Sequence, residues 1–250
     1  MSGVDFKKTY EILYRDIDKN FNCKVTSIMD CLTDVALDHE DSLGIDIQAN
    51  NNHGLVFVFF EYNLKIHRYP KYKEKVVVRT HIDTIQKFYA SRSFKVESES
   101  GESIATATSL AVMIDVEKRR LAKVPDEYYE KHEIDKNIKI RPTKLTIEKL
   151  ENITIEKDIE IRFLDFDSNG HINNAKYFEW SLDVIPTDIL KNYLLKEVKI
   201  KFTKEVVDED KPKIEIEIIE ENEEIKMRHK ISNDKGEEVN IMESYWKRAE

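Results

Sequence analysis

Cysteine is scarce in this sequence, with only Cys23 and Cys31 among 250 residues. Two thiols cannot build a disulfide framework, and they cannot supply a four-ligand zinc site. The seven histidines are scattered along the chain and form no metal-binding spacing with these thiols. The composition therefore predicts a protein that works without a metal ion or a bound cofactor, and in which neither cysteine is a nucleophile.

Long apolar runs and an excess of positive charge are also missing. No stretch of about 18 apolar residues occurs, and residues 1–6 resemble neither a secretory signal nor a transit peptide. We therefore expect no membrane span and a cytoplasmic location. The 49 acidic residues outnumber the 40 basic ones, giving a net charge of −9. This balance argues against nucleic acid as a partner, because phosphate binding needs a basic face.

What the chain does contain is a repeated order of one strand, one helix and four strands. Apolar and alternating runs predict helices at 27–43 and 174–185. They predict strands in the first half at 7–18, 55–66, 75–83, 88–98 and 103–116, and in the second half at 158–166, 193–204, 213–220, 225–232 and 238–247.

This repeat predicts an α+β protein of two similar domains, 1–124 and 158–250. Each domain would be an antiparallel sheet wrapped around its own central helix. The charged segment between them, 125–157, carries Pro125 and Pro142 and predicts a linker with short structured pieces.

The densest polar chemistry stands where the predicted strand 158–166 meets the predicted helix 174–185. Asp167, Asn169 and His171 follow at two-residue spacing, so a carboxylate, an amide and an imidazole come together beside the N–H groups of a helix start. Two other interpretations compete. An EF-hand calcium loop fits the first eight positions from Asp165, but its twelfth position is Lys176 instead of a glutamate ligand. The segment could also be a plain turn whose polar groups only satisfy the backbone.

The first half carries a degenerate copy of this motif. The pattern Asp16-x-Asp18-x-Asn20 matches residues 165–169 at one constant offset, and at that offset Asn22 stands where His171 stands. The chemistry is therefore predicted in the second copy only.

Taken together, these residues resemble the acyl-acyl-carrier-protein thioesterases of bacteria and plant plastids. Residues 167–177 match the family motif Asp-x-Asn-x-His-Val/Ile-Asn-Asn-x-Lys-Tyr position for position, and segments 36–44, 66–70 and 105–115 look like the family's first half. The resemblance implies a double hotdog fold and hydrolysis of fatty acyl-acyl carrier protein to free fatty acid, which ends chain elongation. The implied partner is acyl carrier protein with a phosphopantetheine-linked acyl chain, and the implied location is the bacterial cytoplasm. A homodimer is compatible with this resemblance.

The resemblance also implies a fourth site residue. In the family, a glutamate on the strand after the second helix completes the site, and the match here is Glu205. Plant members carry a cysteine just after that glutamate, whereas this chain has Val206. The departure removes a thiol from any family-based mechanism in this protein.

The same chemistry can be argued from the residues. The thiol released from a thioester has a pKa of about 8.5, so its thiolate can leave with little help from a proton donor. Thioester hydrolysis therefore needs mainly an oriented water and a polarised carbonyl. Asp167 or His171 would accept the proton of water, Asn169 would hold the water or the carbonyl, and N–H groups of residues 173–174 would face the oxyanion. Glu205 would orient the base or replace it, and a covalent anhydride on either carboxylate is the alternative.

The first copy, relieved of catalysis, is predicted to hold the acyl tail. Candidates for its lining are Met29, Leu32, Val56 and Val58, for which a plain core role is the competing interpretation. Two other functions remain open at this stage. One is hydrolysis of acyl-coenzyme A, which shares the pantetheine arm, and the other is a noncatalytic acyl- or calcium-binding module that uses the same turn.

Overall fold

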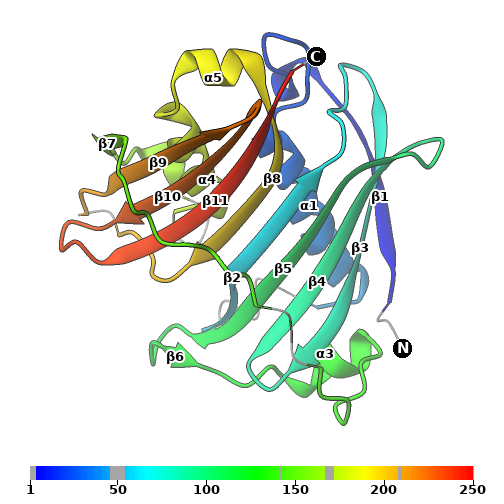
Figure 1. Ribbon diagram of the computed structural model, residues 1–250. Helices are drawn as coiled ribbons and strands as arrows, with labels where there is room; N and C mark the ends of the chain where they lie inside the picture. Colours follow the sequence, from blue (N-terminus) through cyan, green and yellow to red (C-terminus); the bar gives the residue numbers. More distant parts are fainter. Residues whose placement is uncertain are drawn as a thin grey trace. The chain divides into compact units, whose positions relative to one another are not determined.

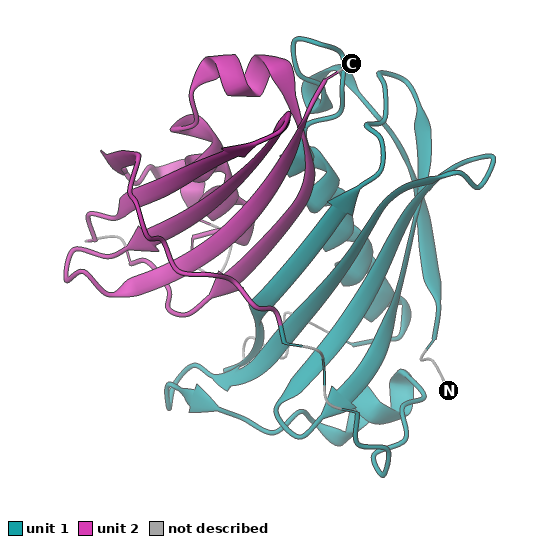
Figure 2. Cartoon of the chain, viewed as in Figure 1, with its two compact units in different colours: residues 1–144 teal, residues 145–250 magenta. Residues whose placement is uncertain are grey.

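The computed structural model describes residues 4–45, 54–140, 142, 144–166, 172–207 and 210–249. The chain divides into two compact units, residues 1–144 and residues 145–250, shown in different colours in Figure 2. Within the described residues, no helix is both long enough and apolar enough to cross a bilayer.

The first unit is an antiparallel sheet packed on one long helix. Its strands lie in the order β1-β3-β4-β5-β2, with the two-residue β6 beside β5. Helix α1 runs along one face of this sheet, against β1 and β3 (Figure 1). The elements are β1 (Phe6–Glu11), the 3-10 turn η1 (Tyr14–Asp16), α1 (Val25–Ser42), β2 (Leu55–Ile66), β3 (Lys75–Gln86), β4 (Tyr89–Ser98), β5 (Ser103–Asp115), β6 (Arg120–Leu121) and α3 (Asp126–Lys131).

The second unit repeats the first in the same strand order. Its strands lie as β7-β9-β10-β11-β8, and α4 lies behind this sheet in the view of Figure 1. The predicted repeat of strand, helix and four strands is therefore confirmed. The elements are β7 (Ile155–Asp158), the 3-10 turn η2 (Phe163–Asp165), α4 (Asn174–Asp183), α5 (Thr187–Asn192), β8 (Tyr193–Phe202), β9 (Lys213–Glu221), β10 (Glu224–Ser232) and β11 (Glu238–Arg248).

Helix α1 forms because apolar residues recur every three or four positions and face the sheet. The buried positions are Val25, Ile28, Met29, Leu32, Val35 and His39. The helix begins two residues before the predicted start, with Lys24 instead of Ser27 at the N-cap, and the Lys24 N–H donates to the Asp16 carbonyl at 2.7 Å. Gly44 follows its end with a φ of +67°, a conformation that favours glycine.

The strand predicted at 158–166 is wrong for most of its length. Strand β7 ends at Asp158, and the chain then leaves the sheet and makes the turn η2. The Ile159 N–H still donates to the carbonyl of Pro212 at 2.8 Å, which keeps the backbone extended for one more residue. The alternating pattern thus indicated an extended backbone, but not one that pairs in a sheet.

The segment 125–157, predicted as a linker, is divided between the two units. Helix α3 buries Tyr128 and Tyr129 in a cluster with Ile85 and Met113, so it belongs to the core of the first unit. Further along, the N–H groups of Glu151 and Asn152 each donate to the carboxylate of Glu217 on β9 at 3.0 Å. This second stretch therefore lies against the sheet of the second unit.

Candidate active site

The residues on both sides of the polar motif are held together at the start of α4. Asp167, Asn169 and His171 themselves lie outside the described residues. Phe166 and Ile172, which flank the motif, pair as an antiparallel bridge. The Asn173 N–H donates to the Asp165 carbonyl at 2.9 Å, and Oδ2 of Asp165 accepts the Arg162 N–H at 2.9 Å. The two ends of the motif are therefore fixed next to each other.

Asn173 is the N-cap of α4. Its Oδ1 accepts the Ala175 N–H at 2.9 Å, which satisfies one N–H group of the first turn. Because the N–H of Asn173 itself is bound to Asp165, it is not available for an oxyanion, and that part of the prediction is wrong. Within the described part of the chain, no acceptor contacts the N–H of Asn174.

The first unit carries the same framework at its own helix start. Ile17 and Cys23 form the equivalent bridge, and the Lys24 N–H donates to the Asp16 carbonyl at 2.7 Å. Oδ2 of Asp16 accepts the Leu13 N–H at 2.9 Å. All of these residues match their counterparts in the second unit at the offset seen in the sequence. The duplication is therefore present in the structure as well as in the sequence.

In this first copy the polar side chains stabilise their own turn. Oδ1 of Asp18 accepts the N–H groups of Asn20 and Asn22, at 2.8 and 3.0 Å. The Nζ of Lys71 donates to Oδ1 of Asn22 at 2.5 Å. The plain-turn interpretation thus describes the first copy well.

The first copy also lacks the glutamate, which the sequence alone did not reveal. After β2, the N–H groups of residues 67 and 68 donate to the Ile104 carbonyl at 2.9 and 3.3 Å. After β8, the N–H groups of residues 203 and 204 donate to the Val239 carbonyl at the same two distances. Counting onward from these matched bonds, Tyr69 stands where Glu205 stands. The match between Tyr69 and Glu205 follows from their equal distance from the ends of β2 and β8. The sequence does not show where these two strands end.

Glu205 lies in an exposed loop that is attached to the first turns of α4. Its neighbour Val206 is buried, and the Val206 N–H donates to the Tyr177 hydroxyl at 3.1 Å. The ring of Tyr177 packs against Phe202 and Trp180, with centroids 5.6 and 5.4 Å apart. Burial raises the pKa of Tyr177 to about 12. The Glu205 loop and the helix that follows the motif therefore meet at Tyr177.

The described contacts do not favour a calcium loop. Asp165, which would be the first ligand, is buried, and one of its oxygens accepts the backbone N–H of Arg162. Lys176, at the position of the required glutamate, places its Nζ 3.9 Å from the other oxygen of Asp165 and 2.6 Å from Glu179. Among the described residues, no three His, Cys, Asp or Glu side chains are grouped to hold a metal ion.

Comparison with known proteins identifies the family. Residues 3–132 match the acyl-ACP thioesterase N-terminal domain, and residues 147–248 match the acyl-ACP thioesterase C-terminal domain. The chain belongs to the acyl-ACP thioesterase family. The predicted α+β tandem hotdog fold is thereby confirmed.

Individual relatives of this thioesterase-family chain come from plants and bacteria. It is 27% identical over 219 residues to the chloroplastic palmitoyl-acyl carrier protein thioesterase of Cuphea hookeriana, covering 81% of this chain and 52% of that protein. The chain thus spans about half the length of such curated relatives. It superposes with a TM-score of 0.89 on a Lactobacillus plantarum protein assigned as an oleoyl thioesterase, at 25% identity over 99% and 98% of the two chains. An acyl-ACP thioesterase from Bacteroides thetaiotaomicron has the same fold, with a TM-score of 0.80 at 18% identity over 97% and 98% of the two chains.

Neither cysteine of this family member has the character of a nucleophile. Cys23 is 1% exposed, and burial raises the pKa of its thiol to about 12. Burial likewise raises the pKa of the Cys31 thiol to about 12. A thiol with such a pKa is protonated at neutral pH and is a poor nucleophile.

The residues predicted to line an acyl-tail pocket fall into two groups. Met29 and Leu32 are buried on α1, whereas Val56 is half-buried on β2 and Val58 is 40% exposed. The side chain of Val58 is therefore open to solvent. Tail binding by these residues stays a prediction.

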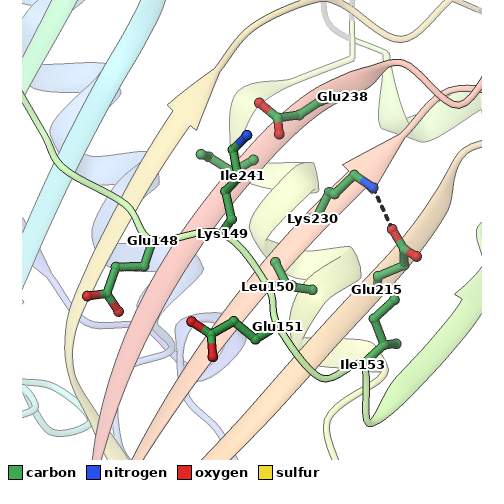
Figure 3. A pocket seen from close by; sticks show the side chains of 9 residues that line it. All are labelled: Glu148, Lys149, Leu150, Glu151, Ile153, Glu215, Lys230, Glu238 and Ile241. Atoms are coloured by element: carbon green, nitrogen blue, oxygen red, sulfur yellow. Dashed lines mark hydrogen bonds and ion pairs between the residues drawn. The ribbon is translucent and has the colours of Figure 1, made fainter.

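Neither these residues nor Glu205 line either of two hollows on the described surface. The hollow in the second unit lies where residues 148–153 cross β9, β10 and β11, and an ion pair of 2.8 Å joins Lys230 and Glu215 at its edge (Figure 3). The hollow in the first unit is lined by Asp5, Phe6, Lys7, Arg79, His81, Ser93, Phe94 and Lys95. Charged side chains make up six of the nine lining residues in the second unit and four of the eight in the first, whereas a site for an acyl tail is lined mainly by apolar side chains.

Proposed function

We propose that this protein hydrolyses the thioester of fatty acyl-acyl carrier protein, releasing free fatty acid and ending chain elongation. The observation that carries the proposal is the complete family motif at residues 167–177, in a chain whose two halves both match the family. The names of its relatives specify acyl-acyl carrier protein thioesterases, which supports the same substrate class for this chain. The attachment of the Glu205 loop to α4 is further support, because it joins two separate parts of one site.

In the proposed reaction, a water molecule attacks the thioester carbonyl carbon. Asp167 or His171 accepts the proton of this water, and Asn169 holds the water or the carbonyl oxygen. The carbon–sulfur bond then breaks, the thiolate of the phosphopantetheine arm leaves and takes up a proton, and the acid is released. Glu205 orients the base. No metal ion or cofactor enters this scheme.

The developing oxyanion needs a hydrogen-bond donor that is already in place. The backbone N–H of Asn174, the first residue of α4, is our candidate, because the N–H groups of Asn173 and Ala175 are bound to Asp165 and to the N-cap side chain. The start of the helix adds the positive end of its dipole to this donor.

We assign catalysis to the second unit and binding of the acyl tail to the first. Asn22 and Tyr69 stand at the positions of His171 and Glu205, so the first copy has neither the imidazole nor the second carboxylate. Met29, Leu32, Val56 and Val58 are the proposed lining of the tail site.

Release of free thiol from acyl carrier protein tests the proposal directly. Palmitoyl-acyl carrier protein and palmitoyl-coenzyme A would each be incubated with the protein in metal-free buffer containing a chelator, with a thiol reagent as the readout. We expect faster turnover with the carrier-protein substrate. Equal or faster turnover with coenzyme A would identify an acyl-coenzyme A hydrolase, and no thiol from either substrate would leave a noncatalytic binding module.

A further inference from the structure

One hydrogen bond joins the loop that carries Glu205 to the helix that follows the polar motif. The N–H of Val206 donates to the Tyr177 hydroxyl at 3.1 Å. Val206 is 1% exposed and Tyr177 is 3% exposed. Removal of either partner would therefore leave a buried polar group without a hydrogen bond. The bond fixes the backbone directly after Glu205 relative to α4.

The corresponding bond is chemically impossible in the first unit. Ile28 stands where Tyr177 stands, at the constant offset of the repeat, and has no hydroxyl group. Pro70 stands where Val206 stands, at the matched distance from the end of its strand, and a proline has no backbone N–H. Both partners are thus missing from the copy that also lacks the imidazole and the glutamate.

The first unit shows that the fold can hold this loop without a tyrosine. There the Pro70 carbonyl accepts the N–H of Cys23 at 2.8 Å, and Lys71 donates to the side chain of Asn22. Because the same architecture forms by other contacts, the Tyr177 bond is not a requirement of the fold. A role tied to the chemistry of the second unit accounts for its presence there.

We propose that Tyr177 is a positioning residue for Glu205, holding the Glu205 loop at the start of α4. The inference rests on the proposed function, because Glu205 needs a fixed place only if it takes part in a reaction. Phe202 and Trp180 hold the ring, so the position of the hydroxyl is set by aromatic packing. Burial, and to a lesser degree the charge of Glu205, raise the pKa of Tyr177 to about 12, so the phenol remains neutral at pH 7.

The variant Tyr177→Phe removes the hydroxyl and keeps the ring contacts. We expect kcat for thiol release to fall about tenfold with little change in KM, since a displaced catalytic group slows the chemical step more than it weakens binding. Tyr62→Phe is the matched control, because Tyr62 is a buried tyrosine whose hydroxyl has no partner among the described residues. It should keep wild-type kcat. A wild-type kcat in Tyr177→Phe would overturn the inference.

A double-mutant cycle with Glu205→Gln separates positioning from general stabilisation. If Tyr177 acts through Glu205, Tyr177→Phe should lower kcat by less than about twofold once the carboxylate is gone. The same tenfold loss in both backgrounds would mean that Tyr177 acts independently of Glu205, and the inference would be wrong.

Hydrogen exchange at the Val206 amide gives a readout that does not depend on activity. In the wild type this N–H should be protected, and in Tyr177→Phe it should exchange at least about tenfold faster while the melting temperature stays close to wild type. Unchanged protection would show that the bond does not hold the loop. A wild type that releases no thiol from any acyl thioester would instead remove the proposed function, and with it the role of Tyr177, even if Val206 is protected.

Discussion

Asp18 and Asp167 occupy the same position in the two halves of the sequence, and the contacts of Asp18 hold it in a turn. Asp18 accepts two backbone N–H groups, and the neighbouring Asn22 is held by Lys71. In the second half, His171 replaces that asparagine and Glu205 replaces Tyr69. At the scale of single residues, the difference between a turn and a proposed active site is therefore a few side chains on one backbone framework.

The first prediction concerns Asp167. We expect Asp167→Asn to lower turnover by about 10²–10⁴, because that is the range for losing a general base or its partner. Steady-state rates on an acyl-acyl carrier protein would measure the loss, and thermal melting would check that the fold is intact. Asp18→Asn, the same change in the first copy, is the control and should keep its rate. A folded Asp167→Asn protein with wild-type turnover would make this residue architectural.

The cysteines give the second prediction. Both thiols are protonated at neutral pH because burial raises the pKa of each to about 12. The double variant Cys23→Ser with Cys31→Ser should therefore keep most of its activity in the thiol-release assay. Loss of turnover in this variant, together with inactivation of the native protein by alkylation, would bring back a thiol nucleophile.

His39 gives a prediction about acid stability. It is fully buried on α1, with Nδ1 at 3.0 Å from the Arg92 guanidinium, and burial together with that charge lowers the pKa of His39 to about 4. The unfolded chain, with an ordinary histidine pKa near 6.5, takes up this proton first. The free energy of unfolding should thus fall as pH drops from about 6.5 to about 4, by up to about 3 kcal/mol.

Melting temperatures measured between pH 6.5 and pH 4 would test whether His39 contributes to this loss of stability. His39→Gln has no proton to take up, so its melting temperature should depend less on pH between 6.5 and 4 than that of the wild type. Some dependence should remain, because burial also lowers the pKa of His229 in the second unit, to about 3. Identical slopes in the two proteins would show that His39 does not contribute.

At the scale of elements, the sequence predicted strands better than connections. Strand β2 has the predicted bounds, Leu55–Ile66, because this apolar run is rich in the aromatic and β-branched residues that favour strands. The alternating pattern from Asp158 onward failed because alternation reports an extended backbone, while pairing depends on where a partner strand ends. The place of helix α3 in the core of the first unit was not predictable, because its buried residues, Tyr128 and Tyr129, lie within a charged segment and pack against distant parts of the chain.

The site was only partly predictable for a similar reason. The motif at 167–171 is a local feature, which spacing along the chain reveals. The bond between Tyr177 and Val206 joins residues 29 positions apart, and the match of Tyr69 to Glu205 depends on where two strands end. Predicting such contacts between distant residues requires the register of the sheet, which cannot be derived from this sequence alone.

The acyl-tail prediction also belongs to this scale, because it assigns a task to α1 and β2. Val56→Trp should shorten the preferred chain and Met29→Ala should lengthen it, since each buried methylene is worth about 0.8 kcal/mol, or roughly fourfold in a rate ratio. Leu37→Trp, on the exposed side of α1, is the control. Rates on carrier-protein substrates from short to long chains measure the preference. An unchanged profile in both folded variants would place the tail elsewhere.

At the scale of the whole molecule, the chain repeats one structural plan in its two units. The two sheets have the same strand order, and each helix start is held by equivalent hydrogen bonds. Duplication of a stable framework leaves one copy free to lose its polar site, because the contacts that hold the fold together do not depend on it. Our account assigns thioester hydrolysis to the second copy and no reaction to the first.

Thiol release from an acyl-acyl carrier protein by the paired variants His171→Ala and Asn22→Ala tests this account most directly. The two changes remove the side chain at the same position of the two copies, and melting curves would verify that both proteins are folded. We predict that His171→Ala loses at least about 100-fold in turnover, whereas Asn22→Ala stays within about twofold of the wild type. Equal turnover in the two variants, whether both high or both low, would contradict the assignment of catalysis to the second copy.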